Sequence, residues 1–457
     1  MYRRCWLETA LSSGVRDEKG CVSSVLQKRH GGMMVDHVLI DRAPGQDRAL
    51  LMQGDRVVEV LADYQHARNL TGSIHRVKIE RVIAGQNRAF ARLADGTPVS
   101  IRLARSDCPA PGTLLAVTIM AAPRDGKAWQ ASLGARLVSA NLVMLAGQQG
   151  ITLSRALAAS LSEGAKEALV DALASLLAEK GLAEDVALIV RRGAARIAAD
   201  ALVAECRALA DDWLAATGGD KASGRGSDDI GVLYDGGGIA AQARCLAPLA
   251  KITETDDAAA AAEFDNRFDQ AIDEACQSSV QLDGGGVMWV EPTKALTAID
   301  LDSGTGTQEA LFAAVPAAIA RALRLRQIGG LVAIDLPRAK PPVMRRVRDD
   351  LDMALAAIPR SPEILGQTRG GVLECRLAYG HPFPTDLGGR MASEVLSVLH
   401  QIAWRPTMAA PAIEISPAMA DWLDTEGGPA LAALDRPVRC IVLSGVTVPG
   451  LVESGYD

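Results

Sequence analysis

Short apolar and alternating runs, separated by glycine and proline turns, occupy the first part of the chain. Residues 34–64 are typical of strands and turns, as in HVLIDRAPG and RALLMQGDRVVEVL. Residues 72–133 continue this pattern, with about five short strands over roughly 60 residues. Strands of this length and spacing predict a small closed β-barrel of the OB type.

Helical periodicity replaces this pattern after residue 141. SEGAKEALVDALASLLAEKG has an acidic first turn and ends at Gly181, and RIAADALVAECRALADDWLAAT is amphipathic. VALIVRRGAA, between them, predicts a strand that enters a turn. Residues 218–229, GGDKASGRGSDD, have the composition of a flexible linker. After a further helix, a mixed α/β section begins near Gly284.

The two ends of the chain differ from this central part. YGHPFPTDLGG, residues 379–389, is rich in Pro and Gly and precedes a compact α+β unit of helix, strand, helix and strand. Residues 1–33 lack the sustained apolar centre of a signal peptide. We expect them to be a disordered extension or a misplaced start, with the true start at Met33 or Met34.

Two aspartates end two apolar strands of the α/β section. In ALTAIDLDSGTG the strand reaches Asp300, and after a helix over about 308–327 the strand LVAID reaches Asp335. Strand, helix and strand within about 40 residues predict a right-handed crossover with two parallel strands. If the strands are neighbours, at about 4.8 Å, both carboxylates converge at one sheet edge. Asp302 lies two residues further on and points to the same face.

Carboxylates held this close repel one another unless they share a proton or bind a divalent cation. Histidines and cysteines are few nearby, so all-oxygen ligation favours Mg²⁺ or Mn²⁺ over zinc. Such a metal polarises a phosphoryl oxygen and generates hydroxide. The alternative is that each aspartate caps a turn, and both interpretations stay open. DLDSG also superficially matches a DxDxT phosphotransferase loop, but Gly304 stands where Thr or Val is expected.

Composition and charge narrow the class of protein. The 457 residues are 49% hydrophobic and 23% charged, with a net charge of -7, which indicates a globular protein of roughly three domain-sized units. The eight cysteines are scattered without a CxxC pair, which favours reduced thiols and a cytoplasmic location. No apolar run approaches the ~20 residues that span a membrane.

The predicted barrel is basic although the chain is acidic. From Arg68 to Asp107 there are eight basic and three acidic residues, which is the pattern of an RNA-binding surface or of a solvated barrel face. Arg321, Arg324 and Arg326 are further candidate phosphate contacts, or they compensate the C-terminal dipole of their helix.

Three segments resemble, in order, consecutive signatures of the ribonuclease E/G family: EPTKALTAIDLDSG, AIARALRLRQIGGLVAIDL and TRGGVLECR. The resemblance runs from about Met34 to the C-terminus and is strongest over 284–376. It implies an α/β and α+β multidomain protein, in which an RNase H-like subdomain is interrupted by an OB-fold barrel and a 5′-sensor region. A DNase I-like catalytic subdomain and a small α+β domain follow. The expected divisions are an extension (1–33), the first RNase H-like part (34–70), the barrel (71–133), the 5′-sensor region (134–215), a linker with the second RNase H-like part (216–277), the catalytic subdomain (278–380), a degenerate link (381–389) and the small domain (390–457).

The resemblance implies a Mg²⁺-dependent endoribonuclease that cleaves single-stranded RNA in RNA processing or decay, with Mn²⁺ as a possible substitute. Asp300 and Asp335 would bind the metal. Asp302 would be the third catalytic residue, at a position where the family usually has Asn. Arg369, in TRGGVLE, matches a family arginine near the scissile region and is expected to bind RNA.

The resemblance also implies RNA contacts outside the catalytic subdomain. Arg191, in LIVRRG, matches a residue that grips a 5′-monophosphate, and Arg192 stands where the family has Thr. In the barrel, Phe90 matches an RNA-stacking aromatic. Three basic barrel residues are expected to contact RNA beside it: Arg76, Lys78 and Arg81.

Two further departures from the family pattern change the expected properties. The second stacking aromatic falls near Ser100, and the loss of one stacking platform removes about 1–3 kcal/mol per base. GHPFPTDLGG lacks the family's CPxC zinc-link, so we expect no zinc there and any homo-oligomer to form without a zinc bridge. These departures leave an alternative open: a catalytically weakened paralogue that binds RNA or a partner without cleavage.

Overall fold

A four-stranded sheet joins two segments that are far apart in the sequence. In the computed structural model, which describes residues 34–452 except 125, 218–228, 361, 406–407 and 409, the strands of this sheet have the order β14-β1-β2-β3. Their bounds are β1 (His37–Ala43), β2 (Gln46–Gln53), β3 (Arg56–Tyr64) and β14 (Lys251–Glu254). β1 pairs with β14 in parallel, from His37 opposite Lys251, and with β2 in antiparallel. The sheet therefore contains strands from both predicted RNase H-like parts, and helices α5 (Gly238–Leu246) and α6 (Ala258–Cys276) pack on it.

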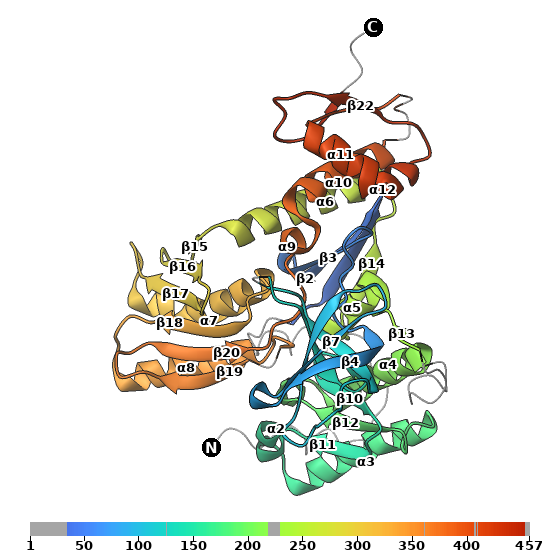
Figure 1. The fold of residues 1–457 in the computed structure, drawn as a ribbon. Helices are drawn as coiled ribbons and strands as arrows, with labels where there is room; N and C mark the ends of the chain where they lie inside the picture. Colours follow the sequence, from blue (N-terminus) through green and yellow to red (C-terminus); the bar gives the residue numbers. More distant parts are fainter. Residues whose placement is uncertain are drawn as a thin grey trace, which may run out of the picture.

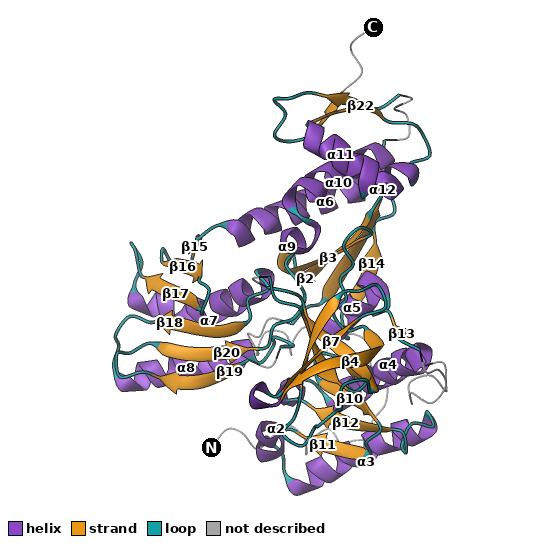
Figure 2. Cartoon of the chain, in the orientation of Figure 1, coloured by secondary structure: helices purple, strands orange, loops and turns teal. Residues whose placement is uncertain are grey.

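The second unit is a closed five-stranded barrel (Figure 2). Its strands are β4 (Ile74–Ile83), β5 (Arg88–Arg92), β6 (Pro98–Arg102), β7 (Leu114–Ala121) and β8 (Trp129–Leu133). They follow the order β4-β5-β6-β8-β7, β4 pairs with β7 to close the barrel, and only β6 and β8 are parallel within it. The short 3-10 helix η1 (Ala84–Gln86) joins β4 to β5, and β13 (Gly231–Tyr234) adds to the outer edge of β4. Alternate residues such as Val77, Ile79, Val99 and Ile101 fill the interior. The predicted OB-like barrel is confirmed.

Helices and a small sheet form the third unit, which holds the predicted 5′-sensor region. Its elements are β9 (Arg136–Val138), β10 (Leu142–Ala146), β11 (Gly150–Leu153), β12 (Val186–Val190), α2 (Arg155–Ser160), α3 (Glu163–Glu179), the 3-10 helix η2 (Arg192–Arg196) and α4 (Ala199–Thr217). α3 begins after Ser162, whose side chain accepts a hydrogen bond from Ala165 N, and it ends before Gly181, as predicted. The predicted linker, residues 218–229, lies outside the described residues except for Asp229, and the predicted N-terminal extension, residues 1–33, lies wholly outside them.

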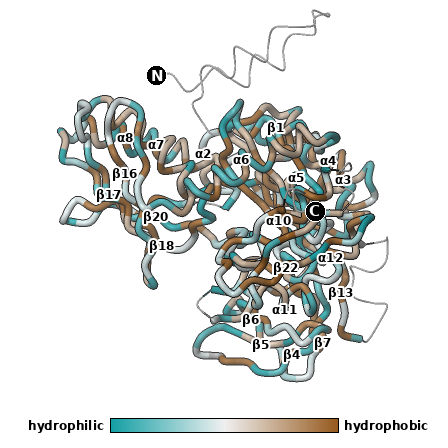
Figure 3. Tube along the Cα trace, turned by 90° about the horizontal axis from the view of Figure 1, so that it is seen from above, coloured by the Kyte–Doolittle hydropathy of each residue, from teal (hydrophilic) through white to brown (hydrophobic). Residues whose placement is uncertain are grey.

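The fourth unit is a six-stranded sheet of order β15-β16-β17-β18-β20-β19. Its strands are β15 (Ser279–Gln281), β16 (Val287–Pro292), β17 (Thr297–Asp302), β18 (Gly330–Asp335), β19 (Glu363–Gln367) and β20 (Leu373–Leu377). Helices α7 (Gln308–Leu325) and α8 (Pro341–Leu355) contact each other and share one core with Ile299 and Ile334. β17, α7 and β18 are the predicted crossover, and β17 and β18 are parallel. Seen from above, this unit projects from one side of the molecule (Figure 3).

The C-terminal unit follows the predicted alternation of helices and strands and lies at the top of Figure 1. Its elements are α9 (Pro384–Gly388), α10 (Arg390–Ala403), β21 (Ala412–Ile415), α11 (Pro417–Thr425), α12 (Gly428–Ala432), β22 (Arg439–Val442) and β23 (Gly450–Val452). The predicted link, 381–389, packs closely against the first sheet, because a Cβ at Gly388 would lie 2.6 Å from the ring of Tyr64. In the part of the chain that the structure describes, no helix is both long and apolar enough to cross a membrane.

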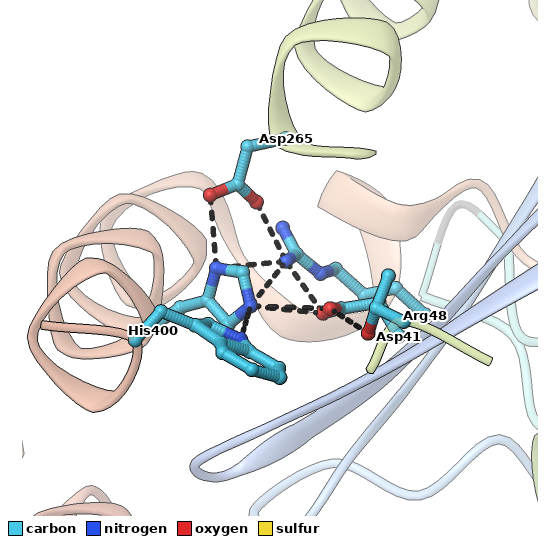
Figure 4. Close-up of polar contacts among 6 residues, drawn as sticks. Asp41, Arg48, Asp265 and His400 are labelled. Carbon is cyan, nitrogen blue, oxygen red and sulfur yellow. Dashed lines mark hydrogen bonds and ion pairs between the residues drawn. The ribbon is translucent and has the colours of Figure 1, made fainter. Parts of the chain in front are cut away.

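A buried cluster of charged side chains connects the first sheet to α6 and α10 (Figure 4). Arg48 donates to Asp41 at 2.8 Å and to Asp265 at 2.7 Å, while the two ring nitrogens of His400 lie 2.9 Å from Asp265 and 3.1 Å from Asp41. Burial alone would raise the pKa of Asp41, but the His400 hydrogen bond and the Arg48 charge outweigh it and lower the pKa to about 2. Because the charges compensate one another, three distant segments can bury them together.

Candidate active site

The two aspartates predicted to meet do lie side by side. β17 and β18 pair in register from Thr297 opposite Val332 to Asp300 opposite Asp335. Their inward neighbours, Ile299 and Ile334, are buried against α7 and α8, whereas both aspartates are exposed on the other face of the sheet. Neighbouring strands are about 4.8 Å apart, so both carboxylates reach one small region of solvent. The catalytic role of the pair stays a prediction.

Asp302 ends β17 and also caps the turn that follows. Its Oδ1 accepts a hydrogen bond of 2.9 Å from Gly304 N, so the turn-capping interpretation applies to this residue. Its exposed side chain lies on the same face as Asp300, because the strand stays paired to its last residue, where Asp302 is opposite Val287. Asp302 therefore fixes the turn and adds negative charge beside the aspartate pair.

Glycines after Asp302 allow two loops to pack backbone against backbone. A Cβ at Gly306 would lie 1.9 Å from the carbonyl oxygen of Gly284, and one at Gly304 would lie 2.5 Å from that of Gly285. Any side chain at these positions would push the two loops apart. The glycines thus determine the path of the chain directly after the aspartates.

Two residues of the same face were not found by reasoning from the sequence. Trp289 on β16 lies opposite Asp300, and Glu374 on β20 lies opposite Ala333. Their neighbours along each strand are buried, so the alternation in MWVEP and LECRL was the signal that identifies them. With the three aspartates, Glu374 makes this face strongly acidic, and a cation bound there would reduce the repulsion among these carboxylates.

The donor set suits a hard, hydrated cation better than a closed metal cage. Among the described residues, no group of three or more His, Cys, Asp or Glu side chains is arranged to hold a metal ion. Asp300 and Asp335 offer two carboxylates, and Mg²⁺ commonly binds one or two carboxylates while it keeps several waters or binds substrate phosphates. The residues present therefore fit Mg²⁺, or Mn²⁺, which has similar ligand preferences.

Arg369 lies at the same sheet edge as the aspartate pair. It is exposed in the hairpin between β19 and β20, where Thr368 N donates to Val372 O at 2.9 Å. Because Leu373 of β20 lies opposite Ile334, this hairpin is next to the end of β18 that carries Asp335. The positively charged side chain of Arg369 thus belongs to the same edge of the sheet as Asp300 and Asp335.

The two predicted 5′-sensing arginines bind groups of the protein. Arg191 donates to the carbonyl oxygens of Ser139 (2.9 Å) and Pro359, and burial lowers its pKa to about 10. Arg192 donates to Asp352 at 2.9 Å. Both side chains therefore hold the third unit against α8 and the loop after it. Their role in phosphate sensing stays a prediction, and a phosphate would have to compete with these partners.

The barrel residues predicted to bind RNA differ in exposure. Lys78 and Arg81 are exposed, and the guanidinium of Arg81 lies 5.1 Å from the ring centre of Phe90. Arg76 is only 6% exposed, so the expected surface contact with RNA is not available to it in this structure. Ser100, in the place of a second aromatic, is buried opposite Phe90.

Comparisons with known proteins point to one family. Residues 248–376 match the Ribonuclease E/G family, and they include the aspartate pair and Trp289. A protein named Ribonuclease E from Nostoc sp. is 37% identical over 117 residues, which are 24% of this chain and 17% of that protein. The Ribonuclease E of Haemophilus influenzae is 37% identical over 121 residues, 24% of this chain and 12% of that protein. That of Escherichia coli is 40% identical over 77 residues, 15% of this chain and 7% of that protein. The chain thus spans less than a fifth of the length of each of these relatives.

Proposed function

This chain belongs to the ribonuclease E/G family, and from that membership we propose that it is a Mg²⁺-dependent endoribonuclease that hydrolyses single-stranded RNA. The observation that carries the proposal is the register of β17 and β18, which sets Asp300 directly beside Asp335 on an open face. This pair lies within the residues that match the family.

The aspartate pair and two neighbouring residues, Asp302 and Arg369, would have different roles in the hydrolysis. Asp300 and Asp335 would hold a Mg²⁺ ion, which would supply Lewis acidity and lower the pKa of a water molecule at the reacting phosphate. Asp302 holds the turn after β17, which keeps Asp300 in place against β18. Arg369, on the neighbouring hairpin, would donate to a phosphate oxygen whose negative charge grows during attack. Hydrolysis in this way leaves a 5′-phosphate on the downstream product.

Contacts outside the catalytic sheet would supply most of the affinity for RNA. Lys78 and Arg81 attract the phosphate backbone, and Phe90 offers one stacking ring beside the guanidinium of Arg81. A preference for 5′-monophosphorylated RNA requires Arg191 or Arg192 to exchange a protein acceptor for the phosphate. A cytoplasmic location and a homo-oligomer without a zinc bridge belong to the same proposal.

Removal of single carboxylates tests the proposal. Asp300→Asn and Asp335→Asn should each lower Mg²⁺-dependent cleavage of a 5′-monophosphorylated single-stranded RNA by at least about 100-fold, the usual cost of one electrostatic stabiliser. Glu363→Gln is the matched control, because Glu363 is an exposed carboxylate on the edge strand β19 of the same sheet. Its cleavage rate should stay within about twofold of the wild type, since surface changes away from the site have small effects.

The same experiment separates the enzyme from the alternative of an RNA-binding paralogue. RNA binding should survive Asp300→Asn, because the barrel residues are unchanged. If the wild-type protein binds the RNA tightly and cleaves none of it across Mg²⁺ and Mn²⁺ titrations, the endoribonuclease proposal is wrong. Cleavage that persists at the wild-type rate in both aspartate variants would also contradict it.

A further inference from the structure

We propose that Trp289 is a stacking platform for a nucleobase of the RNA. This base would be next to the phosphate that is cleaved at Asp300 and Asp335. The inference rests on the proposed function, because it takes single-stranded RNA as the ligand of this face. It adds a binding subsite on the catalytic sheet, separate from the barrel.

The strand register places the indole beside the aspartate pair. β16 and β17 are antiparallel, and Trp289 lies directly opposite Asp300. Directly opposed residues in a sheet project to the same face. Across the open face the order is therefore Trp289, Asp300 and Asp335, on three adjacent strands. With strands about 4.8 Å apart, a base on Trp289 lies within reach of a phosphate at the pair.

Among the described residues, no polar or aromatic partner explains the position of the indole. Its strand neighbours Met288 and Val290 are fully buried on the opposite face, whereas Trp289 is partly exposed. Within the described residues, no hydrogen bond partner, aromatic ring or guanidinium engages the indole. Trp404, by contrast, donates to His400 at 2.9 Å, and Trp422 packs edge-on against His66.

The surroundings favour a nucleotide over an apolar protein segment. Trp289 is bordered by Asp300 on one strand and by Glu291 two positions along its own strand. An apolar partner seated on the indole would bury these carboxylates without compensation, at a high desolvation cost. A nucleotide instead brings a flat base for the indole and a phosphate with its cation for the aspartates. Stacking on an aromatic face is tolerant of sequence, because every base has such a face.

The first test compares Trp289→Ala, Trp289→Phe and Leu365→Ala on an RNA with one cleavage site. Trp289→Ala should lower kcat/KM by about 5- to 150-fold, the range that corresponds to one lost stacking contact. Trp289→Phe keeps a ring and should recover most of this loss. Leu365, a partly exposed apolar residue on edge strand β19, is the matched control and should change kcat/KM less than twofold. Thermal unfolding of each variant identifies losses that come from misfolding.

The second test removes the base instead of the indole. RNAs with a single abasic nucleotide at successive positions around the cleaved bond should show one position where the wild type loses affinity or rate by a similar factor. At that position Trp289→Ala should lose nothing further, because the two changes remove the same contact. An equal abasic effect in wild type and Trp289→Ala, or wild-type cleavage by Trp289→Ala, would overturn the inference.

Measurement of the dissociation constant for the same RNA series, in the Asp300→Asn background, keeps this inference separate from the proposed function. Absence of cleavage by the wild type refutes the endoribonuclease but leaves the binding comparison intact. If Asp300→Asn binds the intact RNA several-fold more tightly than Asp300→Asn/Trp289→Ala, the stacking subsite stands. Equal dissociation constants refute it.

Discussion

Substitution of Gly306 by alanine tests whether the loop after β17 positions the acidic pair. A Cβ at this position would lie 1.9 Å from the carbonyl oxygen of Gly284, whereas ordinary contacts begin at 3.4 Å. The two loops must therefore separate by about 1.5 Å, or the chain after Asp302 must bend. The added Cβ is fixed by the backbone of residue 306, and the atom that it meets is a backbone carbonyl oxygen. No flexible side chain can move aside, so the backbone must take up the strain.

The expected losses follow from this displacement. Inserting a methyl group into close packing typically costs about 1–3 kcal/mol of stability. A displacement of about 1 Å at reacting groups can cost about 100-fold in rate. We therefore expect Gly306→Ala to lower kcat/KM for RNA cleavage by about 100-fold, with little change in RNA affinity, since the basic barrel is unchanged.

The assay combines cleavage kinetics, RNA binding and urea unfolding. Gly164→Ala is the matched control, because a Cβ there meets nothing within 4 Å and the residue lies in the first turn of α3. That control should keep its activity and gain up to about 1 kcal/mol of stability. If Gly306→Ala matches the wild type in kcat/KM and in unfolding, the loop does not position the aspartates as argued.

Three further predictions concern the rest of the molecule. Glu59→Gln removes the carboxylate that pairs with Arg324, and both residues are only 1% exposed. Urea unfolding should show a loss of about 3–5 kcal/mol, and a loss below about 1 kcal/mol would contradict a compensated buried pair. Burial favours the neutral ring of His400, but hydrogen bonds with its two aspartate neighbours outweigh it and raise its pKa. The stabilisation of the folded state by protonated His400 is complete below about pH 6.5 and is lost as the pH rises through the folded-state pKa. The free energy of unfolding of the wild type should therefore exceed that of His400→Gln by less as the pH rises through this range. A difference that does not depend on pH would refute this prediction. Lys78→Ala should reduce the salt slope of RNA binding by about 1, and an unchanged slope would exclude a phosphate contact.

The local pattern of apolar and polar residues was sufficient to predict the barrel, the strand–helix–strand crossover and the neighbouring positions of Asp300 and Asp335. The alternation in the first part of the chain predicted the barrel, and the apolar runs before Asp300 and Asp335 predicted parallel neighbouring strands. These predictions depend on the spacing of apolar residues within one element or one crossover. Spacing of that kind is present in the sequence itself, and handedness rules then limit how the strands can pair.

The partners of the arginines were decided by tertiary structure. Arg324, considered as a phosphate contact, is paired with Glu59, which is 265 positions away in the sequence. Arg191 is bound to the carbonyl oxygen of Pro359, and Arg76 is buried within the barrel unit. A guanidinium has the same five donors at every position, so composition and motif cannot show which arginines already have protein acceptors.

The full composition of the acidic face also required the folded chain. Asp300 could be assigned from its own strand, but Trp289 and Glu374 join it only through the pairing of β16, β17, β18 and β20. Sequence alternation determined that each side chain faces away from the helices. Which of these outward side chains stand next to one another depends on strand order and register, and these are set by packing between segments remote in the sequence.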